Sequence, residues 1–227
     1  MVQREMTKRS RGKKYHSSVH AFSSKIRCRK CGSWYGSKVW HSNSKYRKII
    51  WQCNHKFDGD ERCNTPHLCD EDIQHLFLLA VNKLLVDKDE VIANCREMVA
   101  LLFKTDELEA EQATLLEETQ LISDMVQQTI HENAHVALDQ TEYQKRYDNL
   151  TQRFETAKQC LETVMAELDR MQTQRADIEA FLETFETLPD TLTEFKLENW
   201  HSLVDYATVY STDDIRFTFK HGQEIQA

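Results

Sequence analysis

Hydrophobic residues at helical spacing occupy the middle of this chain. Between Pro66 and Pro189 the sequence has neither glycine nor proline, the residues that most disfavour a helix interior. Acidic residues begin the first helical segment at Asp70, where they would stabilise the positive end of a helix dipole. Apolar positions three and four apart then run to Leu85, and again from about Lys88 to Phe103. The pattern predicts two amphipathic helices whose apolar faces need a globular partner.

From Leu101 onward the apolar stripe narrows to a seven-residue repeat. Its first half has the members Leu101, Leu108, Leu115, Ile122, Val126 and Ile130. A cleaner seam follows, with apolar residues four and three apart and one interruption at Arg175. It consists of Tyr143, Tyr147, Leu150, Phe154, Ala157, Leu161, Val164, Leu168, Met171, Ile178, Leu182 and Phe185. Sustained heptads of this kind predict a coiled coil, with a second helix roughly 60 Å long.

The seam is lost between His131 and Thr141, midway along the helical region. Thr141 followed by Gln144 resembles a capping box, which marks the start of a helix. We therefore predict an antiparallel helical hairpin whose tip lies near residues 131–141. The alternative is one unbroken helix in an intermolecular parallel coiled coil, which the lost seam and the cap signal disfavour.

Alternation typical of strands is confined to the two ends of the chain. Trp34–Trp40 and Lys45–Cys53 are rich in β-forming residues and flank a polar turn, so they predict a hairpin. Near the C-terminus Ile215–Phe219 alternates strictly and predicts a strand, followed by a short return at Glu224–Ile225. The segment from Leu197 to Ala207 predicts a short helix with Trp200, Leu203, Val204 and Ala207 inward.

We expect this C-terminal tail to pack on the helix that begins at Asp70 and to close one small core. The coiled coil would then be an excursion from a compact domain. The expected fold class is α+β: a small zinc β-ribbon domain with a long antiparallel coiled-coil insertion and a C-terminal β-hairpin. The expected segments are a linker at 1–24, the ribbon and its packing helices at 25–100, the coiled coil at 101–187 and the closing helix and strands at 188–227.

Cysteine spacing supplies the strongest chemical signal. Two cysteines two positions apart, followed by two more after a hairpin-sized segment, match a four-thiolate zinc site. These are Cys28, Cys31, Cys53 and Cys63. Gly32 follows the second cysteine and tolerates the positive φ that a tight turn around a metal often requires. Cys69, His55 and His67 are chemically possible substitutes for Cys63 as the fourth ligand.

Disulfide pairing in a secreted domain is the alternative use of these cysteines, and no secretory signal supports it. Cys69, Cys95 and Cys160 remain outside the predicted metal site, which favours a reducing compartment such as the cytoplasm. The sequence also has no apolar run long enough to span a bilayer, so we expect a soluble protein.

The net charge of −8 conceals a division between the two parts of the chain. Residues 1–63 carry 16 Lys+Arg and 4 Asp+Glu, which gives +12 and leaves −20 for the remainder. A basic metal-stabilised head suggests a polyanionic partner, and a two-stranded ribbon fits the major groove of DNA. The candidate DNA-binding residues are Arg29, Lys30, Trp34, Tyr35, Lys38, Lys45, Tyr46, Arg47 and Lys48. Some of the aromatic residues of this ribbon, Trp40 included, could instead only pack around the metal site.

Five stretches together resemble the C-terminal part of a large serine recombinase, or serine integrase, as carried by bacteriophages and conjugative transposons. They are Phe22–Gly32, Trp51–Cys53, Asn133–Tyr143, Ile215–Ile225 and, for the end of the preceding domain, Val2–Met6 with Arg9. The cysteine knuckle alone is common, whereas the knuckle, the coiled-coil insertion and the terminal strands in this order are specific.

The resemblance implies a role in site-specific DNA recombination by a bacterial or phage-encoded protein. The zinc ribbon would bind the attachment site, and the coiled coil would contact other recombinase subunits and control which sites pair. Residues expected at the subunit contact are His131, Asn133, His135, Val136, Leu138 and Tyr143. The catalytic serine of such recombinases belongs to an N-terminal domain that this chain lacks, so we expect no catalysis by this chain alone.

Two other classes of function stay open. In a zinc-stabilised adaptor the coiled coil would mediate protein–protein interaction, and the basic head would not bind duplex DNA. A metal-dependent enzyme is disfavoured because a catalytic zinc keeps an open coordination position, whereas four cysteines fill the shell.

Overall fold

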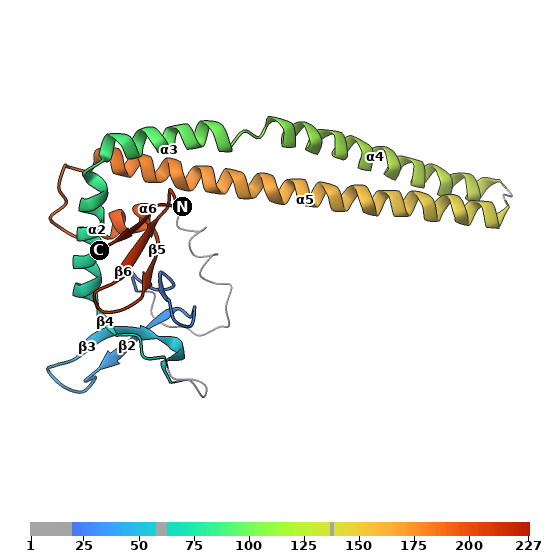
Figure 1. Ribbon diagram of the computed structural model, residues 1–227. Coiled ribbons are helices and arrows are strands. Elements are labelled where there is room, and N and C mark those ends of the chain that lie inside the picture. Colours follow the sequence, from blue (N-terminus) through green and yellow to red (C-terminus); the bar gives the residue numbers. More distant parts are fainter. Residues whose placement is uncertain (1–19, 58–62, 137–138) are drawn as a thin grey trace. The chain divides into compact units, whose positions relative to one another are not determined.

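The computed structural model describes residues 20–57, 63–136 and 139–227, and the chain divides into two compact units. Described residues up to Cys95 join Asp177–Ala227 in the first unit, and Arg96–Ala176 form the second. Figure 1 shows strands and helices in the first unit and paired helices in the second. Residues 1–19 of the expected linker lie outside the described residues.

A four-stranded sheet joins the two ends of the chain. Its strands lie in the order β1 (Ile26–Cys28), β5 (Val204–Val209), β6 (Ile215–Phe219) and β7 (Glu224–Gln226). β1 runs parallel to β5, while β5, β6 and β7 pair antiparallel. The predicted C-terminal strand and its short return are therefore confirmed. The parallel pairing of β1 with β5 is new, because the sequence offers no local signal for it.

The predicted helix from Leu197 to Ala207 is wrong in its second half. Helix α6 covers only Leu197–Leu203, and the chain continues directly as strand β5. Ala207 and Val209 are buried on one face of this strand, and Val204 is buried beyond an irregularity in the β5–β6 register. β-Branched and aromatic residues between them favour a strand, and hydrogen bonding to β1 and β6 on either side decides the outcome.

The ribbon forms a second sheet of three strands in the order β2 (Tyr35–Trp40), β3 (Lys48–Cys53) and β4 (Leu68–Cys69). The predicted hairpin is confirmed, with Tyr35 opposite Cys53 and Trp40 opposite Lys48. The first three residues of the expected return strand, 45–47, belong to the turn instead, and β3 begins at Lys48. A short 3₁₀ helix, η1 (Asn54–Lys56), follows β3, and the two-residue strand β4 was not predicted.

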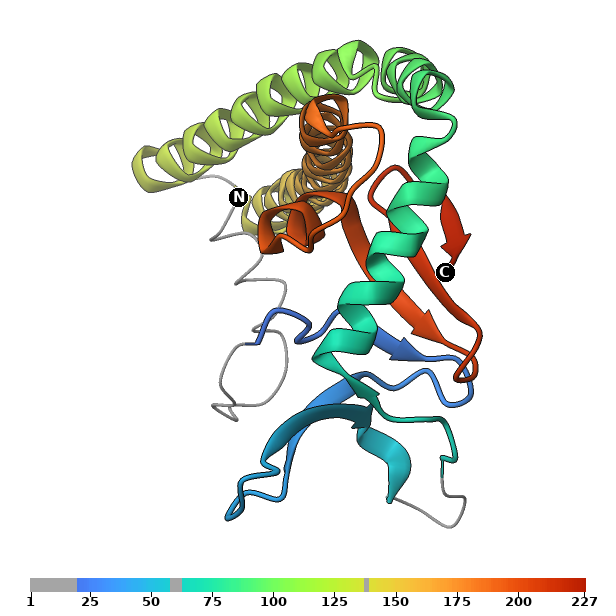
Figure 2. The ribbon, with the colours of Figure 1, turned by 90° about the vertical axis from the view of Figure 1, so that its left-hand side faces the viewer.

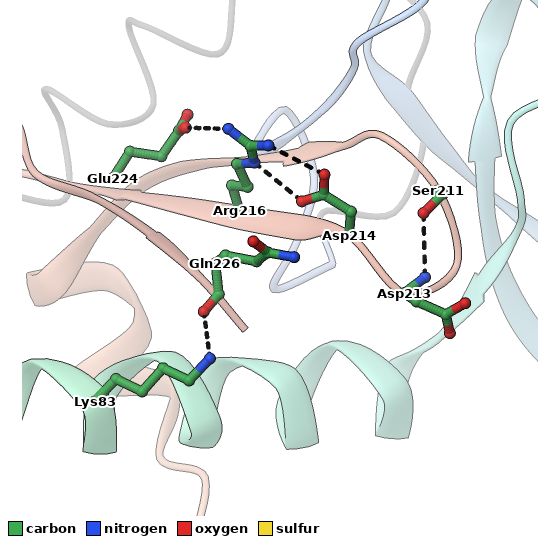
Figure 3. A network of polar contacts seen from close by, with 7 residues as sticks. All are labelled: Lys83, Ser211, Asp213, Asp214, Arg216, Glu224 and Gln226. Atoms are coloured by element: carbon green, nitrogen blue, oxygen red, sulfur yellow. Dashed lines mark hydrogen bonds and ion pairs between the residues drawn. The ribbon is translucent and has the colours of Figure 1, made fainter.

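Helix α2 (Asp70–Leu85) packs against both sheets of the first unit, and Figure 2 shows it lying across the C-terminal strands. Its Phe77 ring lies 5.5 Å from that of Trp200 in α6 and 6.4 Å from that of Phe217 in β6. At its C-terminal end, Lys83 Nζ donates to the carbonyl oxygen of Gln226 at 2.8 Å (Figure 3). The expected packing of the C-terminal tail on this helix is confirmed.

Helix α3 (Lys88–Leu102) follows α2 closely, as predicted. Lys88 Nζ donates to the carbonyl oxygens of Glu186 at 3.0 Å and Leu188 at 2.6 Å. The start of α3 therefore lies beside the end of α5 within the first unit.

The second unit contains α4 (Asp106–His135) and most of α5 (Gln140–Thr187), which run antiparallel (Figure 1). Ile122 of α4 packs with Leu150 and Ala157 of α5, and Arg146 Nη1 lies 3.3 Å from Glu132 Oε2. Every predicted seam position of α5 is buried or half-buried, while Arg175 is exposed. The predicted helical hairpin is thus the structure of this unit. No helix among the described residues is long and apolar enough to cross a membrane.

The predicted seam of α4 needs two corrections. Leu101 lies in the last turn of α3 as an exposed residue, because the helix is interrupted at residues 103–105, where no glycine or proline marks a break. Ile130 is also exposed, and Thr129 is buried in its place. Thr129 lies seven positions after Ile122 and therefore keeps the repeat, and its hydroxyl donates to the carbonyl oxygen of Met125 at 2.8 Å.

The tip of the hairpin is capped by Asp139 instead of the predicted Thr141. Asp139 Oδ1 accepts hydrogen bonds from the backbone N–H groups of Thr141 at 2.7 Å and Glu142 at 3.4 Å. Thr141 lies inside α5 and supplies one of the N–H groups that need capping. These backbone hydrogen bonds lower the pKa of the Asp139 carboxyl group.

Candidate metal centre and nucleic-acid interface

Four cysteine sulfurs converge where the ribbon meets β1. The Sγ atoms of Cys28, Cys31, Cys53 and Cys63 all lie within 4.8 Å of one another. The Cys28–Cys63 pair is 3.4 Å apart and the Cys31–Cys53 pair 3.3 Å, and all four thiols are free. A disulfide requires about 2.05 Å, whereas sulfurs at the corners of a zinc tetrahedron lie about 3.8 Å apart. The spacing is therefore close to that of a metal site and too long for a disulfide.

Local backbone geometry brings the first two sulfurs together. Cys28 ends β1, and its N–H donates to the carbonyl oxygen of Ser33 at 2.8 Å. Gly32 adopts a φ of +69° and donates its N–H to the carbonyl oxygen of Cys28 at 2.9 Å. This left-handed conformation closes the turn that carries Cys31, and it favours glycine. Cys53 at the end of β3 completes this side of the cluster.

The alternative fourth ligands lie elsewhere. Among the described residues, the cluster that could hold a metal contains Cys63 and neither Cys69, His55 nor His67. The His67 ring packs on Trp40, with ring centroids 4.6 Å apart. The backbone N–H of Cys69 donates to Asp72 Oδ2 at 2.8 Å. Cys69 thus forms part of the cap at the start of α2.

Thr65 supports the cluster, and sequence reasoning missed it. Its Oγ1 lies 3.2 Å from Cys63 Sγ and 3.5 Å from Cys28 Sγ. Burial raises the pKa of the Cys63 thiol, but hydrogen bonds from the hydroxyl and backbone of Thr65 outweigh it, and the pKa falls to about 6. The only sequence signal for this role is that Thr65 lies two positions after a predicted ligand.

On the other side of the cluster, hydrogen bonds do not outweigh the effect of burial. Burial is the largest influence on Cys31 and Cys53 and raises the pKa of both thiols. Within the cluster the pKa of Cys63 is thus lowered, whereas those of Cys31 and Cys53 are raised. Four convergent thiols of this kind fit Zn²⁺, which binds thiolates tetrahedrally and displaces their protons.

The basic ribbon presents most of the predicted DNA-binding residues to solvent. The exposed members are Arg29, Lys30, Trp34, Lys38, Lys45, Tyr46, Arg47 and Lys48. The Lys45 ammonium group lies 5.2 Å from the centre of the Tyr46 ring, and that of Lys48 lies 5.8 Å from the Trp40 ring. Cations and exposed aromatic rings therefore alternate along the hairpin.

Tyr35 is placed differently from the other predicted DNA-binding residues. Its side chain is buried, and its hydroxyl donates to the carbonyl oxygen of Pro66 at 2.9 Å. Burial raises the pKa of this phenol, so the group stays protonated. Tyr35 therefore belongs to the packing around the cysteine cluster and is not part of the exposed surface.

The predicted subunit-contact residues lie at the tip of the helical hairpin. The rings of His131 and His135 pack at 4.2 Å, and both side chains are exposed, as is Val136. Asn133 Oδ1 accepts a hydrogen bond from Gln140 Nε2 at 3.0 Å, which ties the end of α4 to the start of α5. Tyr143 is half-buried, and Leu138 lies outside the described residues.

The antiparallel ribbon and its four convergent thiols define a zinc β-ribbon fold. Residues 21–82 match the family model described as "Recombinase zinc beta ribbon domain", and these residues contain all four cysteines and strands β2 to β4. This part of the chain therefore resembles the zinc ribbon domain of recombinases. The resemblance predicted from the sequence is confirmed for it.

One solved structure is similar over most of the chain, a crystal structure of an LSR–DNA complex. The two share 13% sequence identity, with a TM-score of 0.37, over 96% of this chain and 61% of the other. The chain thus spans less than two thirds of the length of its counterpart. No curated protein matches the chain.

Proposed function

We propose that this chain binds attachment-site DNA through its zinc ribbon and pairs subunits through its helical hairpin, as the non-catalytic C-terminal part of a large serine recombinase. The observation that carries the proposal is the match of residues 21–82 to a recombinase zinc ribbon. The matched segment includes both the thiol cluster and the basic hairpin of β2 and β3.

Zinc would have a structural role at this site. Cys28, Cys31, Cys53 and Cys63 would supply four thiolates, which leaves no open position for a substrate or water. Bound there, Zn²⁺ would tie β1 to the end of β3 and to the segment before β4. The metal would thereby hold the hairpin in a fixed orientation on α2.

The hairpin would enter the major groove of the DNA duplex. A two-stranded ribbon fits that groove, and cationic side chains on its edges can reach phosphates on both sides. Lys38, Lys45, Arg47 and Lys48 are exposed and suited to phosphate contacts. Polar residues of the connecting turn at 41–44 would lie closest to base edges.

The helical hairpin has the opposite electrostatic character. Helix α4 carries eight Asp or Glu residues and no Lys or Arg, so DNA phosphates would repel it. Its tip carries exposed Val136 beside His135, which suits contact with protein. The ribbon would therefore bind DNA, and the tip of the helical hairpin would contact another subunit.

Selection of bound duplexes from a random DNA pool, with and without a zinc chelator, tests this function. We expect zinc-dependent enrichment of one sequence motif at about physiological ionic strength. Binding without enrichment would restrict the ribbon to non-specific phosphate contacts. No binding at all would overturn the DNA role and leave an adaptor whose functional surface is the helical hairpin.

A further inference from the structure

One face of the four-stranded sheet carries a row of polar residues outside the ribbon. In register, Arg27 of β1 lies opposite Thr208 of β5, which lies opposite Arg216 of β6. Their neighbours along the strands, such as Cys28, Val209 and Phe217, are buried. Since side chains alternate between the faces of a strand, the row occupies the face opposite the core.

Helix α2 covers the other face of this sheet. Figure 3 shows Arg216 on the side of the strands away from α2, while Lys83 approaches Gln226 from the α2 side. Arg27 is exposed, and Thr208 and Arg216 are half-buried. We refer to the side bearing Arg27, Thr208 and Arg216 as the open face.

The positive charge of the open face is concentrated at its β1 edge. Arg216 is neutralised by Asp214 at 3.0 Å and Glu224 at 3.3 Å (Figure 3). Arg27 and Arg29, by contrast, form no ion pair within the part of the chain that the structure describes. Their charges are therefore available to an outside anion.

Aromatic rings hold both of these guanidinium groups. Arg27 Cζ lies 4.8 Å from the centre of the Trp34 ring and 5.3 Å from that of Tyr206. Arg29 Cζ lies 5.6 Å from the Tyr210 ring. Stacking restrains the side chain but leaves the N–H groups at the guanidinium edge free, and those groups match the oxygens of a phosphate.

The open face is mechanically continuous with the ribbon. Arg27 and Trp34 form a backbone bridge, and Trp34 also accepts a hydrogen bond at its carbonyl oxygen from the N–H of Asn54, at 3.0 Å. Cys28 lies between the two arginines in the thiol cluster. The β1 edge and the basic hairpin are thus anchored to the same four cysteines.

We propose that Arg27 and Arg29 bind backbone phosphates of the duplex that the hairpin reads, so that DNA contact extends onto the open face. This inference rests on the proposed function. The phosphate contacts would add affinity and set the orientation of the ribbon, without contributing base specificity. Because the guanidinium groups are already restrained by Trp34, Tyr206 and Tyr210, little side-chain entropy would be lost on binding.

The test measures DNA affinity against salt concentration for the Arg27→Gln/Arg29→Gln double variant of the full chain. Each phosphate contact contributes about 0.9 to the slope of log K against log salt, so we expect the slope to fall by about 2. The preferred sequence should stay the same. The matched control is Lys104→Ala/Lys158→Ala, which removes two exposed charges from the helical unit and should change neither slope nor affinity.

A second pair of variants leaves the stacked arginines intact. Thr208→Asp places a carboxylate beside Arg27 and Arg216, and should weaken DNA binding at least tenfold. Thr208→Asn, whose side chain has nearly the same shape as that of aspartate but no charge, should bind DNA with the affinity of the wild type. Zinc content and circular dichroism, measured on every variant, identify any variant that fails to fold. If the arginine variant does not fold, the difference in DNA affinity between Thr208→Asp and Thr208→Asn decides whether the open face contacts DNA.

Distinct outcomes separate this inference from the function on which it rests. Unchanged affinity and slope in the folded Arg27 and Arg29 variant, with weaker binding by Lys45→Ala/Arg47→Ala, would overturn the open-face contact alone. Equal binding by Thr208→Asp and Thr208→Asn would also overturn it. Absence of DNA binding by the wild type would overturn the proposed function itself.

Discussion

Single side chains in the first unit have roles that follow from their immediate surroundings. Cys28 is buried at the end of β1, where its sulfur faces those of Cys31, Cys53 and Cys63. His221 follows β6 and is half-buried against the Phe181 ring at 4.4 Å, and its buried Nδ1 has no hydrogen-bond partner among the residues that the structure describes. A bound cation would therefore stabilise the Cys28 thiolate. Protonation of His221 would instead place an unfavourable positive charge in a buried site.

Cys28→Ser should lower the zinc content from about one ion per chain to near zero, because a structural site needs all four thiolates. The ribbon should then lose its folded structure. Metal analysis and near-ultraviolet circular dichroism measure the two effects. Cys160→Ser, which changes an exposed cysteine of α5, should retain the metal. A Cys28→Ser protein with full zinc content would show that the ligand assignment is wrong.

His221→Gln should reduce the pH dependence of stability in the mildly acidic range. Burial lowers the pKa of His221, and the hydrogen bond with Gln223 offsets this only in part. The unfolded chain, with a His pKa of about 6.5, therefore binds more protons than the folded one, and stability falls as pH drops below that value. Denaturant unfolding at pH 7.5 and about 5.5 measures the difference. Equal pH dependence in both proteins would contradict the prediction.

Elements of the two units differ in what supports them, because the ribbon is built on a cluster of four thiols and the helical hairpin on a narrow apolar seam. The hairpin of β2 and β3 has a partly exposed surface and depends on the thiols at its base. The α4–α5 pair depends on a small cluster around Ile122, Leu150 and Ala157. Each element can therefore be changed with little effect on the other.

Lys45→Ala/Arg47→Ala should weaken DNA binding by the ribbon and make it less salt-dependent. Both side chains are exposed, so their removal should not disturb folding. Loss of two phosphate contacts should reduce the slope of log K against log salt by about 2. Fluorescence anisotropy with a labelled duplex measures this. A slope equal to that of the wild type would place the DNA contact outside the hairpin.

Leu150→Ala should destabilise the helical hairpin by about 2–5 kcal/mol, because it leaves a cavity beside Ile122. Hydrogen exchange should show faster opening of α4 and the adjoining half of α5, with the ribbon unchanged. Met165→Ala serves as the control, since Met165 is an exposed residue of the same helix. Equal exchange in the two variants would mean that the cluster does not hold the helices together.

At the scale of the whole molecule, charge and exposed apolar surface are distributed unevenly along the chain. The head of the chain is basic, α4 is acidic, and the tip of the hairpin carries an exposed apolar residue. A protein that reads DNA with one unit and contacts a second copy with the other would be built in this way. DNA binding and self-association should therefore be separable by mutation.

Val136→Asp should impair self-association on DNA while leaving the affinity of a single chain for DNA unchanged. Val136 is 58% exposed at the end of α4, so the substitution has no core to disrupt. Sedimentation velocity with and without a duplex measures the association. Val86→Asp, at an 80% exposed site after α2, is the control. Unaltered association of the Val136 variant would exclude this part of the tip as the contact.

Features that depend on neighbours in sequence could be read without a structure. The period of α5, the alternation of Ile215–Phe219 and the spacing of Cys28 and Cys31 each reflect contacts within one element or turn. The four cysteines that the structure brings together could be singled out for a different reason, because their residue type is rare and chemically specific. Thr65 has neither property, so its role became visible only from its distances to two sulfurs.

Tertiary structure alone decided the features that depend on distant partners. Val204 to Val209 is a strand because β1 and β6 complete its hydrogen bonds, and β1 lies almost the whole chain away in sequence. Tyr35 is buried and Arg27 exposed because of which segments pack beside them. By itself the sequence determined the local periods and the four cysteines that could hold a metal. Non-local pairing determined which side chains remain available for function.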